Sequence, residues 1–275
     1  MRNCLFVFCL AAFTSGVWTT TTAAADLVAR KTESGTVVGY KDTPPLPWTD
    51  GKYCVHDPDR PVPKYVEPMP ADAELPTVPA PADAIVLFDG KDVSRFKSSV
   101  WEVADDSLVA GDGSLETAEA FGDFQLHLQW MVPKEPGPQF MNRGNSGVLL
   151  MGRYELQVFD SHPVHPEQIY PDGQAASVYG QTPPLVNACR LPGQWQSFDI
   201  VFRAPVFQDD KLVKRATVTV LHNGVLVHDH QEIMGPMAHR QVLPYEPHPP
   251  QQPLVLQGHG CPVRFRNIWL RPLDR

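Results

Sequence analysis

The chain has 275 residues, 43% of them hydrophobic, and a formal net charge of −8. This apolar content is ordinary for a globular protein with a real core, and the length suits one large domain or two small ones. The acidic balance argues against binding to nucleic acid, because proteins that bind a phosphate backbone usually carry a basic face.

Residues 1–25 are predicted to form a secretory signal peptide. Arg2 supplies a positive charge, residues 4–13 form an apolar run, and the alanines that end at Ala25 are typical of a cleavage site. We therefore expect a periplasmic or secreted protein that is cleaved near Ala25. The apolar run is shorter than the roughly 20 residues that cross a bilayer, and no later segment approaches that length, so we expect no membrane span.

Residues 26–82 are predicted to form an extended proline-rich arm. The segment from Pro44 to Pro81 holds eleven prolines, and proline lacks the N–H group that helices and sheets need. The stretch 52–61, KYCVHDPDRP, also carries aromatic and apolar residues, so part of the arm is expected to dock. Two roles stay open, namely covering a sheet edge and contacting a partner.

Residues 83–275 are predicted to form one all-β domain. In FQLHLQW, apolar and polar residues alternate strictly over 124–130, which is typical of a strand. Asn223 and Gly224 in ATVTVLHNGVLVHD indicate a tight hairpin. Further short strands are expected at 84–90, 146–151, 153–159, 197–203, 253–257 and 262–273. With no convincing amphipathic helix, this spacing predicts a β-sandwich or jelly roll.

The strand 153–159 is the first candidate site. Its period of two places Tyr154, Leu156 and Val158 on one face, and it places Arg153, Glu155 and Gln157 on the other. An ordinary solvent-facing strand would show the same pattern, so both interpretations stay open.

Asp160 reaches the polar face of that strand only if a β-bulge intervenes. The resulting pattern E-x-Q-x-x-D resembles the E-x-D-x-x-E strand of jelly-roll glucanases, but its centre is an amide. Five residues of strand span roughly 16 Å, whereas a retaining glycosidase needs carboxyl groups about 5–5.5 Å apart. An ordinary glucan hydrolase is therefore disfavoured.

Two loops and the last strand supply further candidates. His259 lies between glycines, which let backbone approach a ligand, and Asn145 lies in the glycine-flanked loop RGNSG, which also fits a plain turn. Arg264 and Arg266 share one face of the last strand, and neighbouring guanidinium groups need an anionic partner. Glu155 is a candidate for that partner, and a purely structural Arg–Glu network fits equally well.

Metal binding and cysteine pairing stay open. The pairs His228/His230 and His162/His165 have spacings that suit a divalent metal, but with ten histidines in the chain chance pairs are expected. The cysteines that remain after cleavage are Cys54, Cys189 and Cys261. Export permits disulfides, yet their spacings match no zinc motif and predict no particular pair.

Seven sequence blocks resemble, in order, the 3-keto-disaccharide hydrolase domain family, which is 3-keto-glucoside lyase/hydratase-like. They are IVLFDGKDVSRF, GNSGVLL, GRYELQVFDS, SVYGQTPP, GQWQSFDIVFRAP, ATVTVLHNGVLV and LQGHGCPVRFRNIWLRPL. The resemblance runs from about residue 83 to residue 273. It implies a concanavalin A-like jelly-roll β-sandwich and an enzyme that acts on glycosides oxidised to a ketone at C3.

The resemblance also implies a mechanism. A base removes the acidified C2 proton, the enolate expels the aglycone from C1, and water adds to the enone. Glu155 or His259 would be the base, and Arg264, Arg266 or a bound divalent metal would stabilise the enolate. Residues expected to bind the substrate are Asn145, Arg153, Gln157, Asp160 and Tyr179.

One position departs from the family pattern. The family usually has Leu-Gln-Asp-His-Gly where this chain has Gly258 in place of the aspartate. If that acid orients the histidine or holds a metal, the chain would be slow or inactive. The departure favours the alternative function, a non-catalytic carbohydrate-binding module on the same fold. The sugar, the anomer, the leaving group and the oligomeric state stay open.

Overall fold

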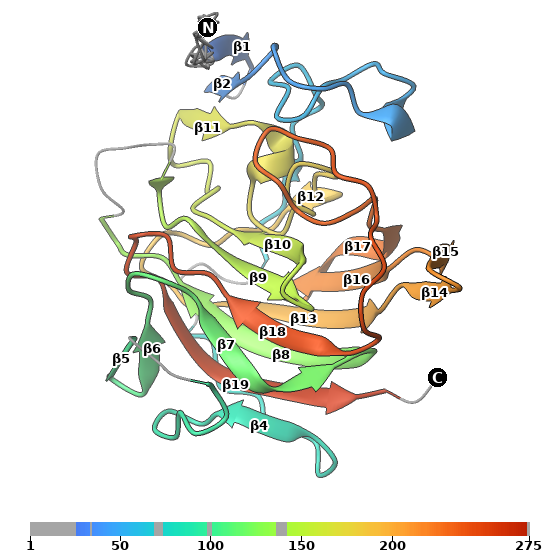
Figure 1. Cartoon of the computed structure of the whole chain (residues 1–275). Coiled ribbons are helices and arrows are strands. Elements are labelled where there is room, and N and C mark those ends of the chain that lie inside the picture. Colours follow the sequence, from blue (N-terminus) through green and yellow to red (C-terminus); the bar gives the residue numbers. More distant parts are fainter. Residues whose placement is uncertain (1–25, 34, 69–73, 98–100, 136–141, 274–275) are drawn as a thin grey trace, which may run out of the picture.

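Two packed β-sheets form the body of the molecule, as the computed structural model shows (Figure 1). The structure describes residues 26–33, 35–68, 74–97, 101–135 and 142–273. The predicted signal peptide at 1–25 lies outside the described residues. The fold is all-β, as predicted, and helix within the described residues is limited to short 3-10 turns such as η1 (Pro47–Thr49) and η3 (Pro171–Gly173).

The smaller of the two main sheets carries the candidate strand. Its four strands lie in the order β10 (Tyr154–Val158), β9 (Ser146–Leu150), β18 (Gln252–Leu256) and β7 (Leu115–Phe121). The larger sheet runs in the order β17 (Val225–Glu232), β16 (Thr217–His222), β13 (Gln196–Arg203), β8 (Phe124–Met131), β19 (Arg264–Pro272), β6 (Ser107–Val109) and β5 (Glu102–Ala104), and β4 (Ile85–Phe88) also pairs with β19.

Three small sheets complete the fold. They join β1 (Val28–Thr32), β2 (Gly35–Gly39) and β11 (Glu167–Ile169); β3 (Lys64–Tyr65) and β12 (Val186–Asn187); and β14 (Val206–Gln208) and β15 (Lys211–Lys214). Within the described residues, no helix is long and apolar enough to cross a membrane.

The core lies between the two main sheets. The apolar face of β8 contributes four side chains with 0% exposure, which are Phe124, Leu126, Leu128 and Trp130. The apolar face of β10, with Tyr154, Leu156 and Val158, belongs to the same cluster of buried residues. The period-two pattern of both strands is therefore confirmed. Burying faces of this kind is the main favourable contribution to folding.

Two strands of the larger sheet and one of the smaller sheet escaped the sequence analysis. These are β5, β6 and β7. The sequence of β7 is LETAEAF, in which glutamate and alanine favour helix and are depleted in strands. Pairing of β7 with β18 overrides this local preference.

The N-terminal arm is more structured than its prolines indicate. β2 pairs in parallel with β11, and β3 pairs in parallel with β12. Leu46 and Val55 of the arm have 0% exposure. Farther along, Gln129 Nε2 donates to Pro76 O at 2.6 Å, so the arm also covers part of the outer face of the larger sheet.

The three cysteines that follow the predicted signal peptide are free thiols. Cys189 and Cys261 are buried and Cys54 is half-buried. The sequence left open whether two of these cysteines form a disulfide. In the structure, no disulfide joins any two of the three.

The predicted hairpin at Asn223 and Gly224 is confirmed between β16 and β17. Both residues have positive φ, 52° and 78°, as the tight turns that fit the twist of a hairpin require. The Asn223 side chain also binds two neighbouring segments of the same chain. Its Oδ1 accepts from Ser197 N at 2.8 Å, and its Nδ2 donates to Ala188 O at 2.8 Å.

Asn223→Ala should lower the free energy of unfolding by about 2–4 kcal/mol. The substitution removes buried hydrogen bonds, worth about 1 kcal/mol each. It also places alanine at positive φ, a backbone conformation in which the Cβ atom approaches the following carbonyl oxygen too closely, at a cost of roughly 1–2 kcal/mol. Urea denaturation measures the change. Asp209→Ala is the control, since Asp209 is exposed and has φ of 48°; equal losses in both variants would contradict the role of the hydrogen bonds.

Candidate active site

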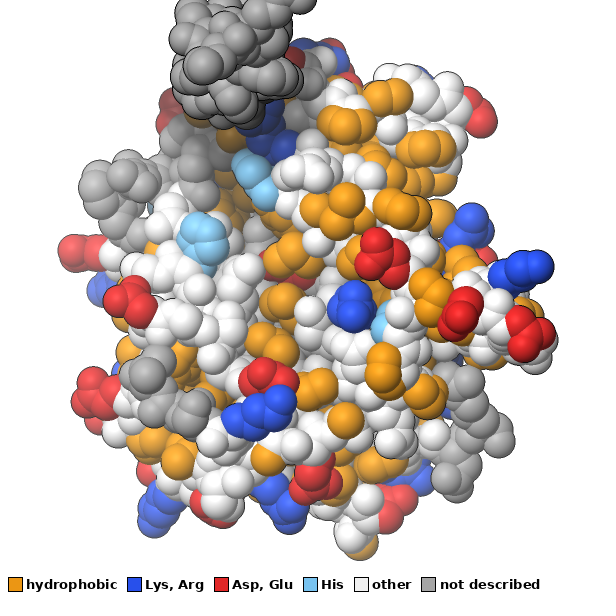
Figure 2. All heavy atoms as spheres, viewed as in Figure 1, with side chains coloured by type: hydrophobic (Ala, Val, Ile, Leu, Met, Phe, Trp, Pro, Cys, Tyr) orange, Lys and Arg blue, Asp and Glu red, His pale blue; other side chains and the backbone are white. Residues whose placement is uncertain are grey.

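A cavity of about 390 Å³ opens on the outer side of the smaller sheet. Figure 2 shows a hollow on this face of the molecule with histidine side chains beside it. The described residues that line the cavity are Tyr40, Asn145, Glu155, Gln157, Tyr170, Tyr179, Met237, His239, Gln257 and His259. Five of them, Asn145, Glu155, Gln157, Tyr179 and His259, are site residues predicted from the sequence.

The polar face of β10 forms the floor of the cavity. Glu155 and Gln157 are each only 3% exposed, so the interpretation of β10 as an ordinary solvent-facing strand is wrong. The backbone of the segment 174–182 lies along the free edge of β10. Tyr179 N donates to Glu155 O at 3.1 Å, and Ala176 N donates to Gln157 O at 2.8 Å. This segment extends the sheet beyond β10 and brings the Tyr179 side chain to the lining of the cavity.

The carboxyl group of Glu155 is held in an unusual environment. Its Oε2 atom is buried and has no hydrogen-bond partner among the described residues. Burial raises the pKa of Glu155 to about 8, because an ionised carboxylate is poorly solvated there. Glu155 is therefore mostly protonated at neutral pH, and its carboxylate is a stronger base than that of an ordinary glutamate.

Gly147 of β9 makes room for this side chain. A Cβ atom at position 147 would lie 2.3 Å from Glu155 Oε1, closer than atoms can approach. The neighbouring strand must therefore carry glycine here for Glu155 to lie over it.

A hydroxyl network lies beside the carboxyl group. Tyr179 Oη is 3.2 Å from Tyr170 Oη and 3.0 Å from His239 Nδ1. Burial raises the pKa of Tyr179, and Glu155 adds to the effect, so Tyr179 stays a neutral phenol. Burial and the nearby His56, Arg240 and His259 lower the pKa of His239 to about 4, so this imidazole is neutral at pH 7.

His259 lies at the exposed rim of the cavity. Its Nδ1 atom is 3.1 Å from Asn142 Oδ1 and 3.4 Å from Asn145 Nδ2. In the tautomer with the proton on Nδ1, His259 donates to Asn142 and Nε2 is the basic nitrogen. In this tautomer the Asn145 amide is a neighbour of the ring and not a hydrogen-bond donor to it. The predicted loop residue Asn145 thus contacts the predicted histidine.

Arg264 and Arg266 are not among the residues that line the cavity, and the predicted contact with Glu155 is wrong. Both belong to β19 of the larger sheet, whereas Glu155 belongs to the smaller sheet. Arg264 pairs with Asp105 at 2.8 Å. Arg266 donates to Gln129 Oε1 at 2.7 Å, and its guanidinium lies over the Trp195 ring. The two arginines therefore belong to a structural network and not to the cavity, and their partners in that network are residues other than Glu155.

Arg153 and Asp160 also lie outside the described lining of the cavity. Arg153 precedes β10 and donates through Nε to Gln252 Oε1 at 3.2 Å. Asp160 is fully buried and lies 2.7 Å from His165 Nε2. The two-carboxylate arrangement of a retaining glycosidase is therefore absent from the described lining residues, where Glu155 is the one carboxyl group.

The histidine pairs do not form metal centres. Among the described residues, no group of three or more His, Cys, Asp or Glu side chains is arranged to hold a metal ion. His228 is buried and its Nε2 is 2.8 Å from Ala176 O, whereas His230 is exposed, because a bulge interrupts β17. His162 contacts Tyr65 Oη at 3.3 Å, and His165 pairs with Asp160.

The sequence analysis missed half of the described lining. These residues are Tyr40, Tyr170, Met237, His239 and Gln257. Gln257 could have been found, because it lies two residues before His259 at the end of a predicted strand. The others come from arm and loop segments that carry no periodic pattern.

A close approach of backbone explains Gly258. A Cβ atom at this position would lie 2.0 Å from Gly113 O and 2.4 Å from Gly111 O. The segment 111–113 therefore occupies the space that an aspartate at position 258 would need, and the acid expected from the family pattern cannot be accommodated here.

Comparisons with known proteins bear on the family and the fold. The family described as a 3-keto-alpha-glucoside-1,2-lyase-like domain matches residues 83–271. A protein from Parabacteroides distasonis assigned as a glycosyl hydrolase has a similar structure, with a TM-score of 0.64 and 41% sequence identity, covering 70% of this chain and 85% of its own. A second structure from the same organism with the same assignment has a TM-score of 0.51 and 20% identity, and covers 70% and 94%; it supports the fold alone. No curated protein matches the chain.

Glu155→Gln should stabilise the protein increasingly as the pH rises. The pKa of Glu155 is about 8 in the folded chain and about 4.3 in the unfolded chain. Between these values only the unfolded chain releases the proton, so the wild type loses stability with rising pH. The free energy of unfolding of the variant should equal that of the wild type near pH 4 and should be larger by about a few kcal/mol at pH 8.

Urea denaturation at several pH values measures this difference. Glu102→Gln is the control, because Glu102 is an exposed residue of strand β5, and it should change stability little at any pH. A constant difference between Glu155→Gln and the wild type from pH 4 to pH 8 would contradict the raised pKa.

Gly258→Ala and Gly258→Asp should both lower the free energy of unfolding by about 1–3 kcal/mol or more, the usual cost of overpacking. The cause is steric, so the two losses should be similar. Thermal unfolding compares them with the wild type. A stable Gly258→Asp variant would show instead that the segment 111–113 can move aside for an acid.

Proposed function

We propose a function from one premise: the chain belongs to the family of 3-keto-alpha-glucoside-1,2-lyase-like domains. It is a carbohydrate-active, hydrolase-like enzyme. We infer that it cleaves 3-keto-glycosides by elimination followed by hydration. The predicted signal peptide supports the further proposal that it works outside the cytoplasm, in the periplasm or after secretion.

One observation carries this proposal, namely a single buried carboxyl group on the floor of the cavity. Glu155 has a pKa of about 8, and no second carboxyl group is among the described lining residues. Direct glycoside hydrolysis generally needs two carboxyl groups. Elimination from a 3-keto-glycoside needs only a base of suitable pKa at C2, because the neighbouring ketone acidifies that proton.

The first step is removal of the C2 proton. Glu155, in its ionised form, takes this proton, and the C2–H bonding electrons form an enolate whose charge rests on the C3 oxygen. The enolate then expels the aglycone oxygen from C1, which breaks the C1–O bond and leaves a double bond between C1 and C2. A base whose pKa lies near the working pH combines adequate ionisation with adequate strength.

The developing enolate needs hydrogen-bond donors. Because Arg264 and Arg266 lie elsewhere, neutral groups take this role among the described residues. The Tyr179 phenol keeps its proton, and the Gln157 amide lies on the same floor as Glu155. Preorganised neutral donors in a site that excludes water stabilise an oxyanion effectively.

A second proton carrier is needed at the aglycone and for hydration. His259 lies at the rim, where solvent and the leaving group have access, and its hydrogen bond from Nδ1 to Asn142 orients the imidazole. We assign its imidazolium form to protonate the departing oxygen through Nε2. The neutral imidazole that remains then takes a proton from the water that adds to C1. The Glu155 carboxyl group exchanges its proton with solvent in the cavity and then protonates C2, so the sum of the two stages is hydrolysis with a solvent-derived hydrogen at C2.

The test is cleavage in deuterated water followed by NMR. The mature protein should cleave a 3-keto-disaccharide, leave the unoxidised disaccharide intact, and place deuterium at C2 of the product. Cleavage of the unoxidised sugar without deuterium would contradict elimination. Binding of either sugar without cleavage, with and without added divalent metal, would instead favour the non-catalytic binding module.

The pH profile and two variants then separate the two proton carriers. If Glu155 is the base, kcat/KM should rise with pH roughly tenfold per unit and level off near pH 8. Glu155→Gln should abolish deuterium exchange at C2, whereas His259→Gln should slow cleavage and retain exchange. Full activity of Glu155→Gln would overturn the assignment, and Glu102→Gln is the matched control.

A further inference from the structure

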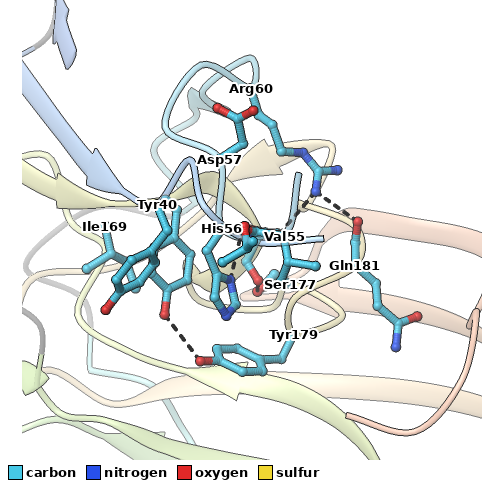
Figure 3. A network of polar contacts seen from close by, with 12 residues as sticks. Tyr40, Val55, His56, Asp57, Arg60, Ile169, Ser177, Tyr179 and Gln181 are labelled. Atoms are coloured by element: carbon cyan, nitrogen blue, oxygen red, sulfur yellow. Dashed lines mark hydrogen bonds and ion pairs between the residues drawn. The ribbon is translucent and has the colours of Figure 1, made fainter. Parts of the chain in front are cut away.

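Part of the described cavity lining comes from the N-terminal arm. The family match begins at residue 83, whereas Tyr40 lines the cavity and His56 lies directly behind it. Figure 3 shows His56 beside Tyr179, which is far from it in the sequence, and Tyr40 on the other side of His56. The cavity therefore contains a component that the matched domain does not supply.

A buried ion pair holds this part of the arm in place. Asp172 has 0% exposure, and its Oδ2 accepts from His56 N at 3.0 Å and from Arg60 Nη1 at 3.2 Å. Burial alone would raise the pKa of Asp172, but His56 and Arg60 outweigh it and hold that pKa below its usual range. Arg60 also donates to Gln181 O at 3.0 Å. The arm is thus tied to the loops around the cavity by charge-assisted hydrogen bonds.

This attachment positions aromatic rings along the cavity. The His56 ring stacks on Tyr170 with 3.9 Å between centroids. The Tyr40 ring lies edge-on to His239 at 6.1 Å and tilted against Tyr170 at 6.1 Å. The Arg240 guanidinium lies over the Tyr40 ring at 4.6 Å. Tyr40 is half-buried, so part of its side chain remains open to a ligand.

The lining of the cavity combines two kinds of chemistry. The floor residues Glu155 and Gln157 mark where the reacting sugar ring must lie if Glu155 removes the C2 proton. Tyr40 and His239 supply aromatic surface, and the Tyr179 hydroxyl contacts His239 at 3.0 Å. Aromatic side chains with a polar tip suit a sugar, which presents C–H groups on its ring face and hydroxyls at its edge.

The described lining also limits the charge of the ligand. It contains no lysine or arginine. Arg240, whose guanidinium lies over the Tyr40 ring, is already paired with Asp42 at 3.0 Å. A uronate carboxylate would therefore be desolvated without a free lysine or arginine partner among the lining residues, which is costly. A neutral unit has no such penalty.

We propose that Tyr40 binds the leaving unit of the substrate and that this unit is a neutral sugar. The inference rests on the proposed function. It makes the arm a specificity element, which adds a subsite for the leaving unit to a domain that carries the chemistry.

The experiment compares two substrates with the same keto sugar. One is a 3-keto-disaccharide with a neutral leaving sugar, and the other is the methyl 3-keto-glycoside, which has almost no leaving unit to bind. Tyr40→Ala should lower kcat/KM about tenfold on the disaccharide, as the loss of one aromatic contact implies, and should change it little on the methyl glycoside. Tyr40→Phe should retain most of the activity on both.

Tyr53→Ala is the matched control, since Tyr53 lies in the same arm but does not line the cavity. It should leave both substrates unaffected, and thermal unfolding verifies that each variant is folded. If the wild type cleaves, the inference would be overturned by an equal loss of kcat/KM for Tyr40→Ala on both substrates, or by no loss on either. A wild type inactive on both substrates would overturn the proposed function and the inference together.

Discussion

Burial of the Glu155 carboxyl group is the constraint around which the site is built. The polar face of a sheet normally meets water, but here a second layer of chain covers the face of β10. The segment 174–182 pairs with its edge, the arm closes one side, and Gly147 leaves the volume that the side chain needs. Because no cation compensates the carboxylate among the described residues, the proton stays on at neutral pH. The reactivity proposed for Glu155 is a direct result of that exclusion of water.

A second buried carboxyl group shows how environment separates two residues of similar chemistry. Asp172 is as buried as Glu155, yet Arg60 and His56 keep its pKa low and the group ionised. It therefore acts as an anchor for the arm, whereas Glu155 has no such partner and keeps its proton. Opposite pKa shifts of neighbouring carboxyl groups are a recurrent way to divide structural and reactive roles.

The arrangement also explains why one fold can serve a different reaction from the glycosidases that its strand pattern resembles. Asp160 faces His165 rather than the cavity, so the described lining has no carboxyl pair for a double displacement. The neutral donors around the cavity suit an enolate, whose charge is spread over a carbonyl and its neighbouring carbon. The arm then adds aromatic surface where the leaving unit would lie, without changing the groups assigned to the chemistry.

The sequence by itself determined the all-β fold, the side chains that share one face of strands such as β8 and β10, the hairpin at Asn223, and the place of Glu155, Gln157 and His259 at one site. Period two and glycine turns are local properties, and these features need nothing more. Only the tertiary structure decided which sheet each strand joins. Arg264 and Glu155 each lie on the polar face of a strand, but the strands belong to different sheets, and a periodic pattern has no information on that choice. The contribution of Tyr40 and His56 was equally hidden, because it depends on a buried ion pair between residues more than a hundred positions apart.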